Sequence, residues 1–281
     1  MMSAADETRT EQTKLWNNPS GHAWVDMQAV LDQAFAPLET LLVEAVAAAS
    51  PARVLDVGCG TGATTLAVAR QIAPHDGCVG VDISEPMIAA ARARAERERL
   101  RVTFICANAQ EHAFDAADVD MVISRFGVMF FDDPVRAFAN LHRAARSVAE
   151  LRCIAWRSVG ENPFMTAAER AAAPVMPNLP PRKTDAPGQF AFANATRVHG
   201  ILKQSGWSAI DLQPLDITCS FPEKELVSYL TRLGPVGLAL QDADDATRAR
   251  VIETIRPAFD PFVHEAEVRF VAACWMISAR A

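Results

Sequence analysis

The chain has 281 residues, of which 50% are hydrophobic and 22% charged, and its formal net charge is −7. These values are typical of a soluble globular protein with one sizeable core. An acidic chain without a run of Lys and Arg argues against a nucleic-acid partner, because neutralising phosphates requires clustered cations. The absence of an apolar run of about 18 residues predicts no membrane span, and the polar N-terminus predicts no signal peptide.

The six cysteines occur singly, and no two of them form a C-x-x-C pair; they are Cys59, Cys78, Cys106, Cys153, Cys219 and Cys274. A zinc ribbon or thioredoxin-like chemistry is therefore not expected, and no metal site is predicted. Unpaired cysteines in apolar runs fit a reducing compartment. The expected location is the cytoplasm.

The first fifty residues predict a tail and a helical arm. Residues 1–10 are polar and are expected to be disordered. Two tryptophans, Trp16 and Trp24, flank a turn. From Met27 to Ala49 the apolar residues follow helical spacing, with a kink expected near Pro37. This arm precedes the first strand, so it should be an addition to the sheet.

Residues 51–158 alternate between short apolar runs and helical patterns, which is typical of a parallel α/β sheet. The predicted strands are 53–57, 78–82, 101–106, 119–124 and 152–157. The predicted helices are 62–72, 85–98 and 134–147. This segment should form the core of a doubly wound, mostly parallel, seven-stranded Rossmann-like fold, and should bind the cofactor.

The pattern changes after Trp156. Six prolines lie between Pro163 and Pro187 with few strand signals, so residues 159–193 are interpreted as a lid insertion. Residues 194–281 should complete the core. They contain a predicted helix at 194–205, a strand at 208–218, a helical insertion at about 223–262 broken at Gly234-Pro235, and a closing strand at 267–279.

The most informative stretch follows the first predicted strand. After Val54, Leu55 and Val57 come three glycines spaced two apart, and a helical pattern begins at Ala63. Glycine permits positive φ and close approach of a ligand to the backbone. A strand, a glycine turn and a helix N-terminus together predict an anion- or nucleotide-binding site. The simpler alternative is an ordinary glycine-rich turn.

Two interpretations of the ligand at this turn are open. With Ala63 in the third glycine position and Asp82 about twenty residues further on, the segment satisfies a dinucleotide fingerprint. Asp56, however, places a carboxylate beside the turn. A carboxylate repels a pyrophosphate and suits a cationic ligand that carries an amino acid.

Several motifs resemble those of one family. They are Val-Leu-Asp-Val-Gly-Cys-Gly-Thr-Gly at 54–62, Gly-Val-Asp-Ile-Ser at 80–84, Ser-Arg-Phe-Gly-Val-Met-Phe-Phe at 124–131, and the Asp-Pro and Ala-Phe-Ala-Asn-Leu segments at 133–134 and 137–141. The stretch resembles class I S-adenosylmethionine-dependent methyltransferases. It is most similar to the small-molecule subgroup that includes the ubiquinone and menaquinone C-methyltransferases. Trp16-Asn17 and Gly21 to Trp24 extend the likeness toward the N-terminus.

The resemblance implies where the methionine half of S-adenosylmethionine binds. The turn would pack against it through Gly58, Cys59, Gly60 and Gly62. Asp56 would order the ammonium group through water or a backbone group. Ser124, at the end of the fourth strand, would offer its backbone carbonyl to the same ammonium.

The resemblance also assigns the nucleoside half. Asp82 would accept hydrogen bonds from both ribose hydroxyls, which one carboxylate can do. Ile83 and Met87 would enclose the adenine, and Asn108 and Ala109 would contact its edge.

Two positions depart from the family pattern. Asn108 stands where the family usually has an aspartate, so it keeps a carbonyl acceptor and loses the charge. The family's Pro-Gly-Gly turn before the fifth strand is replaced by residues 146–151, which contain no glycine. These departures keep an alternative open, a fold member that binds the cofactor or a metabolite without transferring methyl. An NAD-dependent oxidoreductase is a third interpretation.

Candidates for catalysis are fewer. His22 lies in the tryptophan turn that should cover the cofactor, so it is the best-placed base, although a structural or surface role is also open. Arg125 follows the fourth strand, at the edge of the sheet where ligands bind. It is expected either to bind an acidic substrate or to pair with a nearby carboxylate.

Aromatic and apolar side chains suggest the substrate pocket. Phe126, Met129, Phe130 and Phe131 follow the fourth strand, and core packing is the alternative for at least half of them. Trp16 and Trp24 would cover the pocket or hold the N-terminal helix. The insertion would contribute Phe164, Met165, Phe190 and Phe192.

The sequence therefore predicts a methyltransferase that uses S-adenosyl-L-methionine as cofactor and acts on a small, apolar or aromatic molecule. The expected partners are this methyl acceptor and a second copy of the chain in a homodimer.

Overall fold

A mixed sheet organises the molecule. The computed structural model describes residues 4–72, 77–182 and 186–281. The strand order is β3-β2-β1-β4-β5-β8-β6, and a short strand, β7, pairs with β8. The strands are β1 Arg53–Val57, β2 Gly77–Asp82, β3 Thr103–Cys106, β4 Val119–Arg125, β5 Ala145–Trp156, β6 Ser208–Pro222, β7 Val263–His264 and β8 Glu267–Arg280. Strands β1 to β5 are parallel, and β8 runs antiparallel to both β5 and β6.

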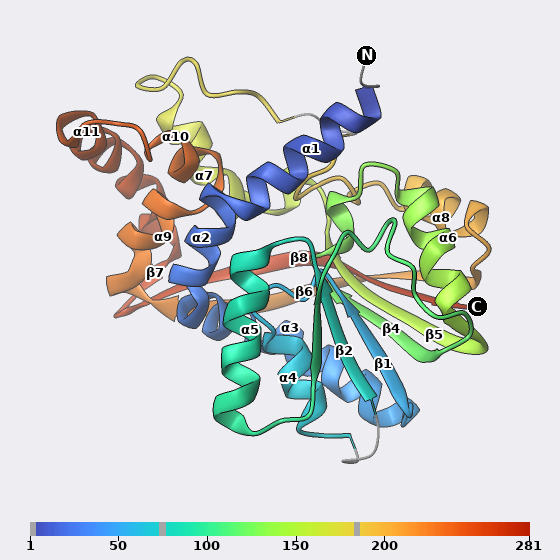
Figure 1. Cartoon of the computed structure of the whole chain (residues 1–281). Helices are drawn as coiled ribbons and strands as arrows, with labels where there is room; N and C mark the ends of the chain where they lie inside the picture. Colours follow the sequence, from blue (N-terminus) through green and yellow to red (C-terminus); the bar gives the residue numbers. More distant parts are fainter. Residues whose placement is uncertain (1–3, 73–76, 183–185) are drawn as a thin grey trace.

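Helices cover both faces of the sheet, which explains why the central strands are apolar on both sides. In β1, the side chains of Val54, Leu55 and Val57 are all buried. One face carries α3 (Gln28–Ala49), α4 (Ala63–Ala69) and α5 (Glu85–Glu98), and the other carries α6 (Pro134–Ala144) and α8 (Ala195–Gln204) (Figure 1). The predicted doubly wound, mostly parallel fold is confirmed. The eighth strand, β7, was not predicted.

Local chemistry sets the starts of the helices. Ser84 is the N-cap of α5 and accepts a hydrogen bond from the Met87 amide, and Asp133 caps α6 by accepting from the Arg136 amide. A proline lies in the first turn of each helix, where its missing N–H costs nothing. Both helices therefore begin where the sequence predicts.

The N-terminal arm consists of α1 (Ala4–Asn17), α2 (Pro19–Asp26) and α3. The expected disorder of residues 1–10 is wrong for residues 4–10, which are helical, whereas residues 1–3 lie outside the described part. A polar sequence does not distinguish a solvent-exposed helix from a disordered tail, because neither shows an apolar stripe. Pro37 lies inside α3, as expected.

A cap of helices occupies one end of the molecule, beside α2 (Figure 1). It comprises α7 (Pro163–Ala172), α9 (Leu226–Arg232), α10 (Gly234–Ala239) and α11 (Asp245–Ile255). Short 3₁₀ helices join the elements at Val128–Phe130, Val159–Glu161, Glu223–Glu225 and Arg256–Phe262. The break predicted at Gly234-Pro235 is present, since α9 ends at Arg232 and α10 begins at Gly234.

The region of the missing glycine turn is extended. Residues 146–151 belong to β5, which begins directly after α6, and the β4–β5 register shifts between Val119 and Met121. The irregularity in pairing accommodates the different path that the sequence implied. Among the residues that the structure describes, no helix is long and apolar enough to cross a membrane.

Candidate cofactor and acceptor site

A cavity of about 360 Å³ opens at the carboxyl ends of the parallel strands. Three parts of the chain line it: the loops after β1 to β4, the N-terminal arm, and the helices of the cap. Ligands of open α/β sheets bind at this edge, because loops from neighbouring strands converge there. The cavity therefore lies where the sequence places the site.

The glycine turn is held by close backbone contacts. Gly58, Gly60 and Gly62 have φ values of 67°, 55° and 84°, in the left-handed region that favours glycine. A Cβ atom on Gly58 would lie 2.4 Å from the Cα of Gly127. The amides of Gly58 and Cys59 both donate to the Val81 carbonyl, at 2.8 and 3.1 Å. The turn is thus fixed against β2 and against the loop after β4.

Asp82 connects this turn to the next loop. Its Oδ2 accepts from the Gly60 amide at 2.9 Å, and its Oδ1 accepts from the Ser84 amide at 2.9 Å. Burial raises the pKa of this carboxyl, and the backbone N–H bonds oppose that shift. A carboxylate offers about four acceptor sites. The carboxylate that holds these amides also lines the cavity.

The other predicted nucleoside contacts also line the cavity: Ile83, Met87, Asn108 and Ala109. The Oδ1 atom of Asn108 accepts from the Gln110 amide at 3.0 Å, so the carbonyl is already engaged within its own loop. The amide group of Asn108 supplies two N–H donors besides this oxygen. Asn108 therefore presents a different balance of donors and acceptors from the aspartate usual in the family.

Four predicted cofactor residues do not line the cavity: Asp56, Cys59, Gly62 and Ser124. The Asp56 carboxylate accepts from Thr65 Oγ1 at 2.6 Å, and burial raises its pKa to about 6. Ser124 Oγ donates to the Val57 carbonyl at 2.7 Å and accepts from the Gly127 amide at 3.2 Å. Their side chains thus bond to the segments that flank the turn, which are β1, α4 and the loop after β4.

Cys59 and Gly62 face the α5 side of the turn. Cys59 is buried in an apolar cluster with Leu66 and Phe104, and burial raises the pKa of its thiol well above its usual range. A Cβ on Gly62 would lie 2.9 Å from the Phe104 ring. Both residues pack the turn onto the core.

His22, predicted either as a base or in a structural or surface role, lies outside the lining of the main cavity. Its side chain is exposed and lines a second cavity, between α2 and the cap helices. Two residues further along α2, a little more than half a turn around the helix, Trp24 lines the main cavity. Among the described residues that line the main cavity, none is a histidine.

Arg125 does line the cavity. One of its terminal nitrogens donates to the Phe35 carbonyl of α3 at 3.3 Å, and the guanidinium lies 6.0 Å from the centre of the Phe35 ring. Burial lowers its pKa, opposed first by the charge of Glu39. Of the two predicted outcomes, an ion pair with a nearby carboxylate is not formed within the part of the chain that the structure describes.

Aromatic rings form the remaining walls. Phe126 and Trp156 stack in parallel, with centroids 4.5 Å apart and planes 6° apart. The Phe35 ring meets both edgewise, at 5.4 and 6.0 Å. Trp16 packs edgewise on Phe130 at 5.0 Å. All four apolar residues predicted after β4 line the cavity: Phe126, Met129, Phe130 and Phe131.

The insertion contributes only in part. Phe164 and Met165 line the cavity, as do Trp16 and Trp24. Phe190 and Phe192 do not: Phe192 packs beside Phe138 in the core, and Arg182 lies over the Phe190 ring. The sequence missed Tyr229, Leu230, Leu233 and Phe259 of the cap. Their helical spacing was visible, but no local pattern shows that these helices fold back over the sheet.

The N-terminal arm is hydrogen-bonded to the loop after β2. Ser84 Oγ donates to the Trp16 carbonyl at 2.6 Å. Asn17 Nδ2 donates to the Ile83 carbonyl at 3.0 Å, and Asn17 Oδ1 accepts from the Glu85 amide at 2.8 Å. The Trp16-Asn17 pair therefore covers one side of the cavity through polar contacts to the loop after β2.

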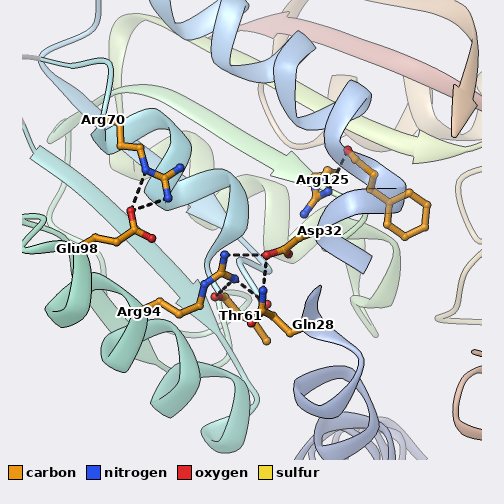
Figure 2. Close-up of polar contacts among 8 residues, drawn as sticks. Gln28, Asp32, Thr61, Arg70, Arg94, Glu98 and Arg125 are labelled. Atoms are coloured by element: carbon orange, nitrogen blue, oxygen red, sulfur yellow. Dashed lines mark hydrogen bonds and ion pairs between the residues drawn. The ribbon is translucent and has the colours of Figure 1, made fainter. Parts of the chain in front are cut away.

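An arginine outside the cavity lining is hydrogen-bonded to the glycine turn. Arg94 of α5 donates to the Thr61 carbonyl at 2.9 Å and pairs with Asp32 of α3 at 2.7 Å (Figure 2). Gln28 also donates to Asp32, as Figure 2 shows. The turn, α3 and α5 are thus joined by one polar network that the sequence pattern did not reveal.

Known proteins resemble part of this chain. Residues 54–147 match a family model described as a methyltransferase domain. The uncharacterized protein Rv1405c of Mycobacterium tuberculosis is 32% identical over 174 residues, which is 62% of this chain and 62% of that protein. Aklanonic acid methyltransferase DauC of a Streptomyces species is 36% identical over 108 residues, covering 38% of this chain and 49% of DauC.

Solved structures agree on the fold. The YcgJ protein from Bacillus subtilis superposes with a TM-score of 0.57 at 16% identity, covering 86% of this chain and 97% of that one. Residues 54–147 therefore form a methyltransferase domain, and the chain shares its fold with the YcgJ protein.

Proposed function

We propose that the protein transfers a methyl group from S-adenosylmethionine to a small, apolar or aromatic molecule. The observation that carries this proposal is the continuity of the cavity. It joins the loops after β1, β2 and β3, which the family uses for its cofactor, to a chamber walled by aromatic rings. Apolar walls with a few polar groups are typical of small-molecule sites.

The loops would hold the cofactor as follows. The Asp82 carboxylate, which lines the cavity, would accept from the ribose hydroxyls, and Ile83 and Met87 would enclose the adenine. Asn108 and Ala109 would meet the adenine edge, with the Asn108 amide donating to a ring nitrogen. The backbone at Gly58 and Gly60 would contact the methionine portion.

Residues beneath the turn would act at longer range. With a pKa of about 6, Asp56 is mostly ionised at pH 7. Its charge would favour the cationic sulfonium and ammonium groups over a neutral ligand. Cys59, Gly62 and Ser124 would keep the turn in the shape that the methionine portion requires.

The chemistry needs little beyond position. A lone pair on the acceptor forms a bond to the methyl carbon while the electron pair of the carbon–sulfur bond moves to sulfur, which leaves as a neutral thioether. Orienting the two reactants and excluding water can supply about 7–11 kcal/mol of the barrier. The aromatic walls from the arm and the cap would perform both tasks.

One observation supports a second candidate. Asn108 has no charge, and its Oδ1 already accepts from the Gln110 amide, so one acceptor position and no carboxylate would face the adenine amine. A protein that binds the cofactor or a metabolite without transferring methyl is compatible with this change. An NAD-dependent oxidoreductase is less well supported, because the carboxylate of Asp56 disfavours a pyrophosphate.

Calorimetric titration of the full chain with S-adenosylmethionine, S-adenosylhomocysteine and NAD tests the cofactor. Binding of the first two without NAD is expected, and binding of NAD alone would contradict the proposal. Incubation of methyl-labelled S-adenosylmethionine with extracts rich in aromatic metabolites tests transfer. Cofactor binding without label transfer to any small molecule favours the non-catalytic candidate.

A further inference from the structure

The cavity contains a cation whose charge no neighbour matches. The Arg125 guanidinium carries five N–H donors. With the part of the chain that the structure describes it forms one hydrogen bond, to the Phe35 carbonyl at 3.3 Å. Within residues 4–72, 77–182 and 186–281, no carboxylate lies at ion-pairing distance from it. A buried or partly buried charge without a partner costs free energy.

The acids nearest to Arg125 are committed elsewhere or lie further away. Asp32 is paired with Arg94 at 2.7 Å, as Figure 2 shows beside Arg125. Asp56 is bonded to Thr65 at 2.6 Å. Glu39 acts on Arg125 only through its longer-range charge, and burial raises the pKa of Glu39 itself. None of the three supplies the oxygen atoms that a guanidinium fork binds.

The second arginine that lines the cavity is different. Arg182 forms two hydrogen bonds with the two carboxylate oxygens of Glu169, at 2.8 and 2.5 Å. Its guanidinium also lies 4.9 Å from the centre of the Phe190 ring. The charge of Arg182 is therefore satisfied within the protein, whereas that of Arg125 is not.

The surroundings of Arg125 suit a flat molecule. Phe126 follows it in the chain with a φ of 67°, a left-handed conformation that is rare for a residue with a bulky side chain. This conformation directs the Phe126 ring onto Trp156, parallel and 4.5 Å away. Phe35, whose carbonyl binds Arg125, completes the group. A cation thus lies beside broad aromatic surfaces.

We propose that Arg125 binds an oxyanion of the methyl acceptor, an inference that rests on the proposed function. The acceptor is then a flat, ring-bearing anion, such as an aromatic carboxylate or a ring-conjugated enolate. Its oxyanion receives the free N–H donors of Arg125, and its ring lies against the aromatic walls. The planar guanidinium binds such a group with two parallel hydrogen bonds, which a lysine cannot reproduce.

This arrangement also relates the acceptor to the cofactor. Arg125 and the sulfonium of the proposed cofactor are both cations and repel each other when they share a cavity. An anion between them removes this repulsion. Arg125 is therefore a specificity-determining residue, which favours acceptors that are already ionised in a cavity whose described lining holds no histidine.

The proposal is tested by a calorimetric titration of the full chain. The chain is first saturated with S-adenosylhomocysteine and is then titrated with 2-naphthoate or with the neutral 2-naphthamide. The wild-type chain should bind 2-naphthoate about 10- to 100-fold more tightly, the range for hydrogen bonds to charged groups. Arg125→Gln should abolish this preference while the affinity for S-adenosylhomocysteine stays unchanged. Arg125→Lys should retain part of it, because the charge remains and the fork is lost.

Arg182→Gln is the matched control, since it removes the same charge from the same cavity and should leave the preference intact. Equal binding of the two probes by the wild-type chain, or a preference that survives in Arg125→Gln, overturns the inference. The affinity for S-adenosylhomocysteine separates the two proposals. If it is normal and the preference is absent, only the inference fails; if the chain binds NAD and not S-adenosylhomocysteine, the proposed function fails.

Discussion

The cofactor side of the cavity and its acceptor side are held together by different interactions. On the cofactor side, backbone groups and short polar bonds fix the turn: Gly58 contacts Gly127, and Asp82 accepts the amides of Gly60 and Ser84. On the acceptor side, rings from distant segments pack edgewise or in parallel, as Phe126, Trp156 and Phe35 do.

The difference shows which side tolerates change. A Cβ added to Gly58 would meet the backbone of Gly127, so a substitution there should be costly. Apolar walls accept volume-conserving exchanges at less than about 1.5 kcal/mol. Relatives with this fold can thus keep one cofactor while their acceptor chambers differ.

Substitution in the glycine turn should have the largest effect. Gly58→Ala places a Cβ 2.4 Å from the Gly127 Cα in a residue with positive φ. Overpacking and the left-handed conformation together should lower the free energy of unfolding by about 2–5 kcal/mol, measured by urea denaturation.

Gly160→Ala is the control for that substitution, because nothing lies within 4 Å of the added atom. Its effect should stay within about 0.5 kcal/mol. Similar losses in the two variants would mean that the turn is not tightly constrained.

The charge beneath the turn should cost stability at neutral pH. Burial raises the pKa of Asp56 to about 6 in the folded chain, from 3.8. Between pH 4 and 6 the folded chain keeps a proton that the unfolded chain has lost, so the free energy of unfolding falls as pH rises through this window. Above pH 6 the loss is complete, at about 3 kcal/mol.

Asp56→Asn should therefore be about 3 kcal/mol more stable than the wild-type chain at pH 7.5 and about equal to it at pH 3.5. Denaturation at a series of pH values gives the difference. A wild-type-like slope between pH 4 and 6 in the variant would assign the pH dependence to another group.

Loss of the predicted ribose acceptor should weaken cofactor binding. Asp82→Ala should reduce the affinity for S-adenosylhomocysteine by about 1.5–3 kcal/mol, as measured by calorimetry. Asp244→Ala is matched to it, because Asp244 also accepts a backbone amide, that of Thr247, but at the start of α11. An unchanged affinity in Asp82→Ala would move the ribose site away from β2.

The smallest effect should come from replacing Asn17, which joins the N-terminal arm to the loop after β2. Asn17→Ala removes the hydrogen bonds to the Ile83 carbonyl and from the Glu85 amide. Amide exchange in α2 should become about fivefold faster, which corresponds to about 1 kcal/mol.

Asn18→Ala serves for comparison, because Asn18 Nδ2 donates only within its own arm, to the Lys14 carbonyl. It should leave α2 exchange nearly unchanged. Equal acceleration in the two variants would show that the arm is not held by the cofactor loop.

The geometry of the glycine turn could be predicted from the sequence because it is local. The spacing of Gly58, Gly60 and Gly62 requires a turn of one shape, and the end of the next strand must place Asp82 beside it. Three residues that the resemblance assigns to the methionine portion, Asp56, Cys59 and Ser124, lie outside the cavity lining. Their contribution to cofactor binding stays a prediction.

Sequence alone thus determined the sheet, the glycine turn and the position of Asp82, because each follows from the conformation of a few adjacent residues. Tertiary structure decided the rest. It turned His22 away from the cavity, brought Tyr229 and Phe259 to it from more than a hundred residues beyond β4, and left Arg125 without an ion pair among the described residues. Contacts between distant segments depend on packing, which no local pattern records.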